Sequence, residues 1–181
     1  MVLSKPRVFY GWWIVVASCI LWLYSSAYVF TFGMFLDVFA DEYGWGMATL
    51  SGAYSTGAVC RAILGPLIGY LVDTFGPRMI VLTGVVVAGS SFLLVQYITS
   101  IWMFYLIFGF LLSMSSGPIF IGCLASVTNW FERRRSFAIS LLTTAWVGGG
   151  AIIAPTAAWL IHQYGWQLTA NVIGVMYLAT G

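Results

Sequence analysis

The sequence predicts an all-α membrane protein that crosses the bilayer about six times. Of its 181 residues, 61% are hydrophobic and only 7% are charged, whereas a soluble domain carries about 25% charged residues. The stretches between the charge clusters are apolar, continuous and long enough for a transmembrane helix, which needs roughly 20 residues. Backbone groups in lipid must bond within a helix or a closed barrel, and these stretches lack the short alternating segments of barrel strands.

Five complete spans and the beginning of a sixth are expected at residues 10–35, 49–72, 79–98, 101–128, 137–161 and 168–181. The first apolar run is far longer than the roughly 7–15 residues of a signal-peptide core, so we expect it to be retained. The sixth run stops at Gly181 after 14 residues. Because a partial span has no stable place in lipid, we expect the chain to be an amino-terminal half that lacks its carboxy-terminal half.

The basic residues predict the orientation of the spans. With a cytoplasmic amino terminus, six of the seven Lys and Arg residues lie in cytoplasmic segments and none in external ones. Cytoplasmic loops carry such an excess of basic residues, so the sequence predicts a multi-pass integral membrane protein with its amino terminus inside. The six are Lys5, Arg7, Arg78, Arg133, Arg134 and Arg135.

Neither a cofactor nor a metal is expected. Cys19, Cys60 and Cys123 lie inside apolar stretches at unrelated spacings, which favours packing over a disulfide framework or a metal site. The sequence shows no glycine-rich phosphate loop and no paired intramembrane aspartates, so it does not indicate an enzyme. The net charge of +2 is not gathered on a dense basic face, so it does not indicate a nucleic-acid partner.

A shift of 89 residues superposes two similar segments of the chain. Residues 63–76 (ILGPLIGYLVDTFG) then align with residues 152–165 (IIAPTAAWLIHQYG), with Pro66 on Pro155 and Gly76 on Gly165. Three spans separate the two segments, so they end on opposite sides of the membrane and predict two inverted three-helix repeats. Such repeats are typical of secondary transporters, and shared apolar composition is the alternative explanation for the match.

The turn after the second span carries a family resemblance. Its sequence GYLVDTFGPR places four residues at the spacing G-x-x-x-D-x-x-G-x-R, and this pattern resembles the signature of the major facilitator superfamily. The four are Gly69, Asp73, Gly76 and Arg78. The resemblance implies that they form a cytoplasmic gate which stabilises one state of an alternating-access cycle. An arginine held inside and a tight turn are the simpler alternative.

Each residue of this motif has a physical role that the sequence suggests. Gly69 allows helices to approach closely, and Gly76 allows the backbone to reverse. Asp73 can pair with a basic group or a helix amino terminus. Arg78 supplies a forked cation at the membrane face.

Other segments resemble the monocarboxylate transporter and oxalate–formate exchanger branch of this superfamily. They are YGWW at residues 10–13, FTFGMF at residues 30–35 and WFERRRSFA at residues 130–138. Thr74 departs from the pattern, since arginine is common there, and the subfamily stays open. The resemblance implies a plasma-membrane carrier of small monocarboxylates or dicarboxylates, working by proton symport or by anion exchange. A non-transporting receptor or assembly subunit is the alternative.

Four residues are candidates for the substrate cavity. The resemblance places Phe30, Phe120 and Trp146 at aromatic cavity positions, and ordinary packing is the alternative for each. Arg61 lies near the middle of the second span, where a charge is costly and usually faces a cavity or a partner. It is either an anion-attracting charge on the translocation path or an arginine buried against helix carbonyls or the second half. Gly148–Gly150 and Pro155 in the fifth span predict a flexible or close-packed region.

Overall fold

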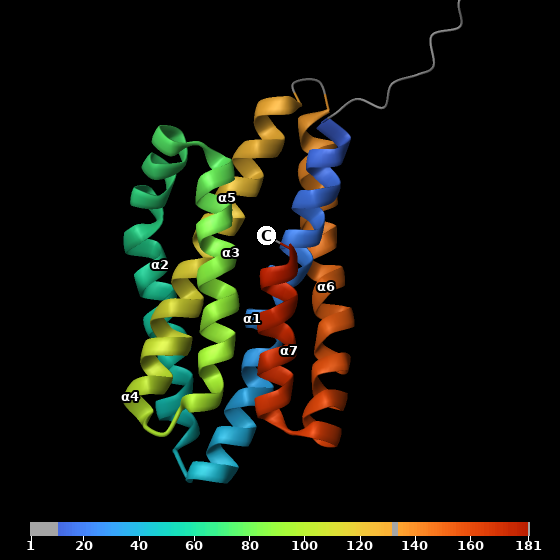
Figure 1. The fold of residues 1–181 in the computed structure, drawn as a ribbon. Helices are drawn as coiled ribbons and strands as arrows, with labels where there is room; N and C mark the ends of the chain where they lie inside the picture. Colours follow the sequence, from blue (N-terminus) through green and yellow to red (C-terminus); the bar gives the residue numbers. More distant parts are fainter. Residues whose placement is uncertain (1–10, 132–133, 181) are drawn as a thin grey trace, which may run out of the picture.

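The computed structural model describes residues 11–131 and 134–180, and these form helices and short connections without a strand (Figure 1). The helices are α1 (Gly11–Tyr43), α2 (Met47–Phe75), α3 (Pro77–Leu94), α4 (Ile101–Phe104), α5 (Leu112–Trp130), α6 (Arg135–Tyr164) and α7 (Trp166–Thr180). A short 3₁₀ segment, η1 (Val95–Tyr97), continues α3, and a π-helical segment, η2 (Tyr105–Leu111), joins α4 to α5. The predicted all-α fold is confirmed.

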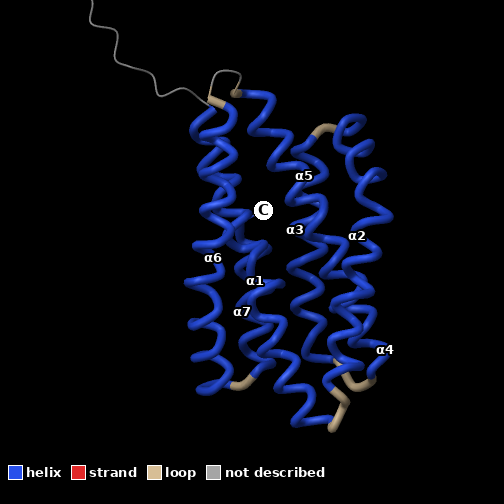
Figure 2. Tube along the Cα trace, turned by 180° about the vertical axis from the view of Figure 1, so that it is seen from behind, coloured by secondary structure: helices blue, strands red, loops and turns tan. Residues whose placement is uncertain are grey.

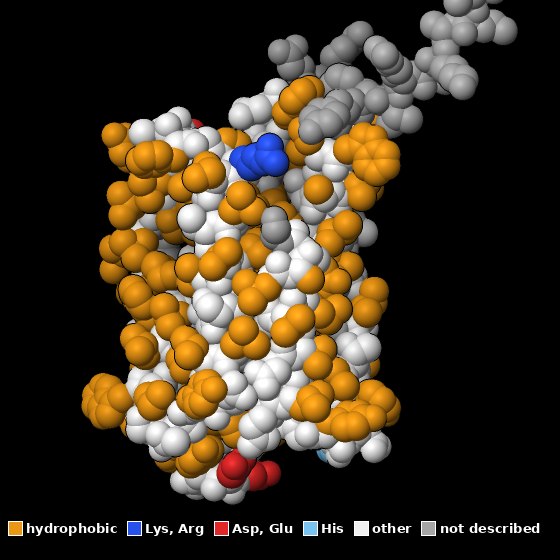
Figure 3. Space-filling view, in the orientation of Figure 1, with side chains coloured by type: hydrophobic (Ala, Val, Ile, Leu, Met, Phe, Trp, Pro, Cys, Tyr) orange, Lys and Arg blue, Asp and Glu red, His pale blue; other side chains and the backbone are white. Residues whose placement is uncertain are grey.

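Five helical stretches of the described chain are long and apolar enough to cross a membrane. They are Gly11–Tyr43, Met47–Phe75, Pro77–Tyr97, Ile101–Trp130 and Arg135–Tyr164. Together with the 15 residues of α7, they run alternately up and down through the bundle (Figures 1 and 2). In the middle of the visible face, hydrophobic side chains alternate with uncharged side chains and backbone (Figure 3). The visible Lys and Arg lie near the end where α2 turns into α3, and most visible Asp and Glu lie at the opposite end (Figure 3).

The first helix is longer than the sequence suggested. The first span was expected to end at residue 35, but α1 continues to Tyr43 and includes the acidic residues Asp37, Asp41 and Glu42. Neither glycine nor proline interrupts the chain between Gly33 and Gly44. At Gly44 the backbone turns to φ +66°, and its N–H donates to the Ala40 carbonyl at 3.0 Å. The helix therefore ends where the backbone turns at Gly44, and not where the hydropathy of the sequence falls.

The core lies where α1 meets the fourth span. Its largest fully buried side chains are aromatic, and they are Trp22, Phe35, Phe39, Phe92, Phe104 and Phe108. The helix α1 packs most extensively on α6, and α3 packs on α5 and α7. Lipid tails are as apolar as these side chains, so the hydrophobic effect does not drive membrane helices together. Van der Waals packing of the buried rings therefore holds the helices at their spacing.

Two turns at opposite ends of the bundle have the same geometry. Gly76, between α2 and α3, has φ 83° and ψ 150°, and Gly165, between α6 and α7, has φ 84° and ψ 164°. Each N–H donates to the carbonyl four residues earlier, Val72 or Ile161, at 3.0 Å. The helices that precede them contain Pro66 and Pro155. This agreement of backbone conformation supports the inverted repeat independently of amino-acid composition.

Candidate functional site

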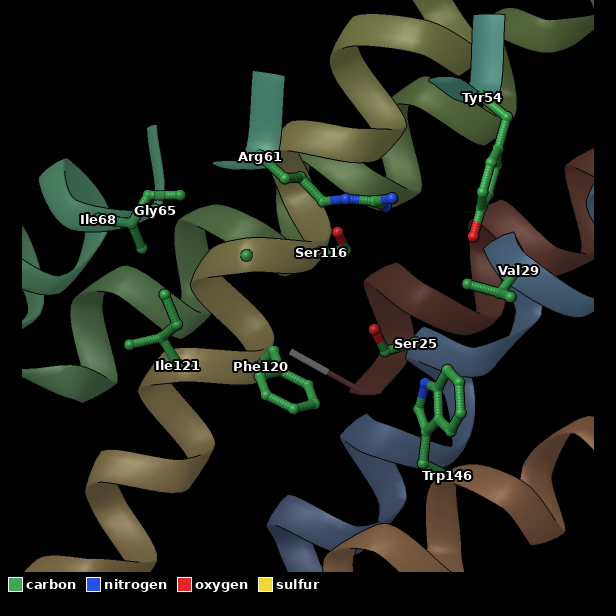
Figure 4. Close-up of a pocket in the computed structure, with 11 residues that line it drawn as sticks. Ser25, Val29, Tyr54, Arg61, Gly65, Ile68, Ser116, Phe120, Ile121 and Trp146 are labelled. Atoms are coloured by element: carbon green, nitrogen blue, oxygen red, sulfur yellow. The ribbon is translucent and has the colours of Figure 1, made fainter. Parts of the chain in front are cut away.

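A cavity of about 370 Å³ opens between four of the helices. All of its described lining residues come from α1, α2, α5 and α6, and α3 and α7 contribute none. The lining consists of Ser25, Val29, Tyr54, Arg61, Gly65, Ile68, Ser116, Gly117, Phe120, Ile121 and Trp146. Three of the four cavity candidates from the sequence, Arg61, Phe120 and Trp146, are therefore brought together on one surface (Figure 4).

The apolar part of the cavity is an aromatic wall. Phe120 stacks on Trp22 of α1, with ring centres 4.3 Å apart and an interplanar angle of 16°. Trp22 is buried, so it supports Phe120 from behind the wall. The fourth candidate, Phe30, does not line the cavity. Its ring lies 5.5 Å from that of Trp146 and contributes to the wall only through this neighbour.

The polar part of the cavity centres on Arg61. Its guanidinium carbon lies 5.7 Å from the ring centre of Tyr28 and 5.6 Å from that of Tyr54. In Figure 4 the Arg61 side chain extends from α2 across the cavity near Ser116, while Phe120 and Trp146 lie farther along the cavity. Within residues 11–131 and 134–180 no acidic side chain forms an ion pair with it. The cavity therefore presents a positive charge that has no acidic partner among the described residues, next to an aromatic surface.

Tyr28 is held firmly in the bundle. It is buried on α1, and its hydroxyl donates to the Phe108 carbonyl at 3.2 Å. The same oxygen lies 2.9 Å from the Ser113 hydroxyl, and since Tyr28 has only one proton to give, Ser113 is the donor in this second bond. Phe108 belongs to the π-helical segment η2. Such segments change the register of backbone hydrogen bonds and are frequent at functional sites.

Sequence reasoning missed the two tyrosines. Tyr54 lies seven residues before Arg61 on α2, a spacing that places two side chains on the same helix face, so this neighbour could have been found. Tyr28 reaches Arg61 from a different helix, and no local pattern predicts that contact. The hydroxyls of Ser25 and Ser116, which add polar groups to the cavity, were also missed.

The predicted gate motif lies at one end of α2. Gly76 makes the turn at positive φ, and Pro77 follows as the first residue of α3. Asp73 and Arg78 are exposed, and neither forms an ion pair within the described part of the chain. Gly69 differs from expectation, because a Cβ placed there meets nothing within 4 Å. Gly69 therefore does not serve close packing among the described helices.

Comparison with known proteins identifies the family. The model of the Major Facilitator Superfamily matches residues 14–181. Among the curated relatives, Monocarboxylate transporter 13 of Bos taurus is 32% identical over 173 residues, which cover 93% of this chain and 40% of the relative. Monocarboxylate transporter 14 of Homo sapiens is 22% identical over 169 residues, covering 93% of this chain and 33% of the relative.

A bacterial relative extends the comparison. The Uncharacterized MFS-type transporter YcxA of Bacillus subtilis is 25% identical over 182 residues, covering 97% of this chain and 43% of that protein. The chain thus spans about two fifths of the length of the first of these relatives. The family match extends over the helices that surround the cavity and over the turn at Gly76. The chain belongs to the Major Facilitator Superfamily.

Proposed function

We propose that the chain forms one wall of a secondary active transporter that moves small organic anions, monocarboxylates or dicarboxylates, by alternating access. The observation that carries this proposal is Arg61, a cation without an acidic partner among the described residues, on an aromatic-lined cavity. A charged residue at the centre of a membrane helix costs about 2.5–3.5 kcal/mol on insertion scales. Such a residue persists where a cavity, a partner or a ligand compensates its charge.

The wall has the two kinds of surface that a small organic anion needs. Arg61 and the Ser25 hydroxyl offer donors for a carboxylate, and Phe120 and Trp146 offer an apolar surface for its carbon skeleton. The Ser116 hydroxyl already donates to the Ser113 carbonyl at 2.7 Å. Binding sites of this kind combine an apolar lining with a few polar groups that fix orientation. The relatives named as monocarboxylate transporters support the same class of cargo.

The orientation and the gate belong to the same proposal. The excess of basic residues supports a cytoplasmic amino terminus and a cytoplasmic Gly76 turn, in a carrier of the plasma membrane. Gly69, Asp73, Gly76 and Arg78 then form the cytoplasmic gate, with Asp73 and Arg78 available for contacts that change during the cycle. The second half of the carrier is the partner that closes the cavity, and its approach gives the open glycine face of α2 a packing role.

The proposal is tested by counterflow in proteoliposomes that contain the full-length protein. Vesicles loaded with an unlabelled anion should accumulate labelled lactate, pyruvate, formate or oxalate from outside. Uptake driven by an imposed proton gradient into unloaded vesicles would identify proton symport, and uptake that requires the internal anion would identify exchange. If none of the anions enters, the proposal fails and a receptor or assembly subunit becomes the better interpretation.

A further inference from the structure

Arg61 is compensated by ring faces in place of a carboxylate. The guanidinium lies within cation–π distance of both Tyr28 and Tyr54, and such contacts are favourable up to about 6 Å from the ring centre. The two rings also stack on each other, with centres 5.9 Å apart and an interplanar angle of 23°. A ring face attracts a cation without cancelling its charge. An acidic partner would neutralise it, so this arrangement keeps the site positive.

The two tyrosines differ in how they are fixed. Tyr28 is buried, and its hydroxyl is engaged by the Phe108 carbonyl of η2 and by Ser113. Tyr54 is half-buried and lines the cavity, and in the described part of the chain its hydroxyl has no hydrogen-bond partner. Loss of the Tyr28 hydroxyl therefore releases a ring on which Arg61 rests, and loss of the Tyr54 hydroxyl leaves both rings in place.

We propose that Arg61 is a carboxylate-binding residue of this half of the carrier and that Tyr28, anchored on the π-helical segment, is the residue that positions it. This proposal rests on the proposed function only in taking an organic anion as the ligand. The carboxylate lies against the guanidinium, and its apolar body lies toward Phe120 and Trp146. A planar guanidinium suits both contacts, because it stacks on rings and presents forked donors to a carboxylate.

Binding of benzoate and of benzamide, its uncharged counterpart, tests the proposal. Equilibrium dialysis with the full-length protein gives a Kd for each labelled compound, and the ratio of the two constants isolates the contribution of charge. Arg61→Gln should weaken benzoate binding by about 10- to 100-fold, the range of a charge-assisted hydrogen bond. Arg61→Lys keeps the charge but loses the planar stacking, so its Kd for benzoate should lie between that of the original protein and that of Arg61→Gln.

The tyrosine variants test the positioning role. Tyr28→Phe should weaken benzoate binding by about 3- to 10-fold, the range of one hydrogen bond. The matched control is Tyr43→Phe, which removes another α1 hydroxyl that donates to a backbone carbonyl, that of Ile98 at 2.9 Å, away from the cavity lining. Its Kd for benzoate should stay within about twofold of that of the original protein, because Arg61 and the rings beside it are untouched. The Kd for benzamide should be the same in all of these variants, since a general disturbance of the cavity would change it as well.

Each outcome decides a separate point. Benzoate binding that is absent, or unaffected by Arg61→Gln, overturns the carboxylate site. Equal effects of Tyr28→Phe and Tyr43→Phe, or a parallel change in benzamide binding, overturn the positioning role of Tyr28. If benzoate binds with the expected pattern but no anion enters proteoliposomes, the proposed transport function fails and the binding site stands.

Discussion

At the scale of single residues, some side chains of the cavity wall are exposed to the cavity, and others are buried behind them and support them. Phe120 is 45% exposed, whereas Trp22 behind it is 2% exposed. We predict that Phe120→Ala raises the KM for transport several-fold while lowering stability by only about 1–2 kcal/mol, because nearly half of its surface is exposed. Trp22→Ala should lower stability by about 3–5 kcal/mol, the cost of removing a buried aromatic side chain.

These two variants are compared by counterflow kinetics and by thermal unfolding in detergent. If Phe120→Ala destabilises the protein as much as Trp22→Ala does, Phe120 is a packing residue and contributes nothing specific to substrate binding.

A second prediction concerns the backbone at Gly76. Its φ of 83° and ψ of 150° fall in a region that only glycine occupies readily, where another residue costs about 1–3 kcal/mol. Gly76→Ala should therefore lower the thermal unfolding temperature, although a Cβ there meets nothing within 4 Å. Gly69→Ala is the matched control, because it too lies in open space but has ordinary helical geometry. An equal loss in both variants would contradict the backbone explanation.

Individual residues were predictable where a local rule applied. Gly76 follows from a motif that needs a backbone reversal, and Arg61 follows from the rarity of charge inside a span. Tyr28 was not predictable, because its contact with Arg61 depends on the distance between two helices. Gly69 contacts none of the other described helices closely, and the sequence does not say which face of α2 meets which neighbour, so a packing role for Gly69 stays a prediction.

At the scale of secondary-structure elements, glycines set the closest contact of α6 with α1. A Cβ on Gly149 would lie 2.6 Å from the Leu23 carbonyl, and one on Gly150 would overlap the Phe30 ring. A Cβ on Gly148 meets nothing within 4 Å. Of the two interpretations of this glycine run, close packing is therefore correct for Gly149 and Gly150.

We predict that Gly149→Ala lowers the free energy of unfolding by about 1–3 kcal/mol, as inserted volume does in a packed core. Gly148→Ala should be neutral or stabilising by up to about 1 kcal/mol, because alanine favours the helix more than glycine does. Thermal unfolding of the two variants in the same detergent measures the difference. Equal unfolding temperatures of the two variants would show that α1 and α6 are not in close contact at Gly149.

The π-helical segment η2 shows that hydropathy predicts the position of a span but not the hydrogen-bond register within it. The fourth span was expected at residues 101–128, and the helical stretch indeed runs from Ile101 to Trp130 through α4, η2 and α5. A π segment differs from an α-helix by its hydrogen-bond register, which packing decides. Here Gly109 of η2 lies so close to α2 that a Cβ on it would be 3.0 Å from the Ala53 carbonyl.

At the scale of the whole molecule, the orientation in the membrane makes a direct prediction. Thr74 near the end of α2 and Gln163 near the end of α6 are both exposed and lie at opposite ends of the bundle (Figure 1). After replacement of the three native cysteines, Gln163→Cys should react with a membrane-impermeant maleimide in intact cells. Thr74→Cys should react only after permeabilisation, and the reverse pattern would contradict a cytoplasmic amino terminus.

The number and order of the spans were predictable, because they depend on hydropathy and length, which are local properties. The position of the cavity was expected only from the family resemblance. Its location between α1, α2, α5 and α6 depends on which helix faces meet, and the hydrophobic pattern of a membrane helix does not distinguish a face that meets lipid from one that meets protein.

The matching glycine turns at Gly76 and Gly165 have a consequence for what the two repeats share. Glycine, proline and aromatic positions recur after 89 residues, but the charges do not. All seven basic residues align with uncharged ones, and Arg61 aligns with Gly150 and Arg78 with Gln167. The internal symmetry therefore extends to the turns and to the helix positions of proline, whereas the basic residues that bias the orientation and the cavity cation stand outside it.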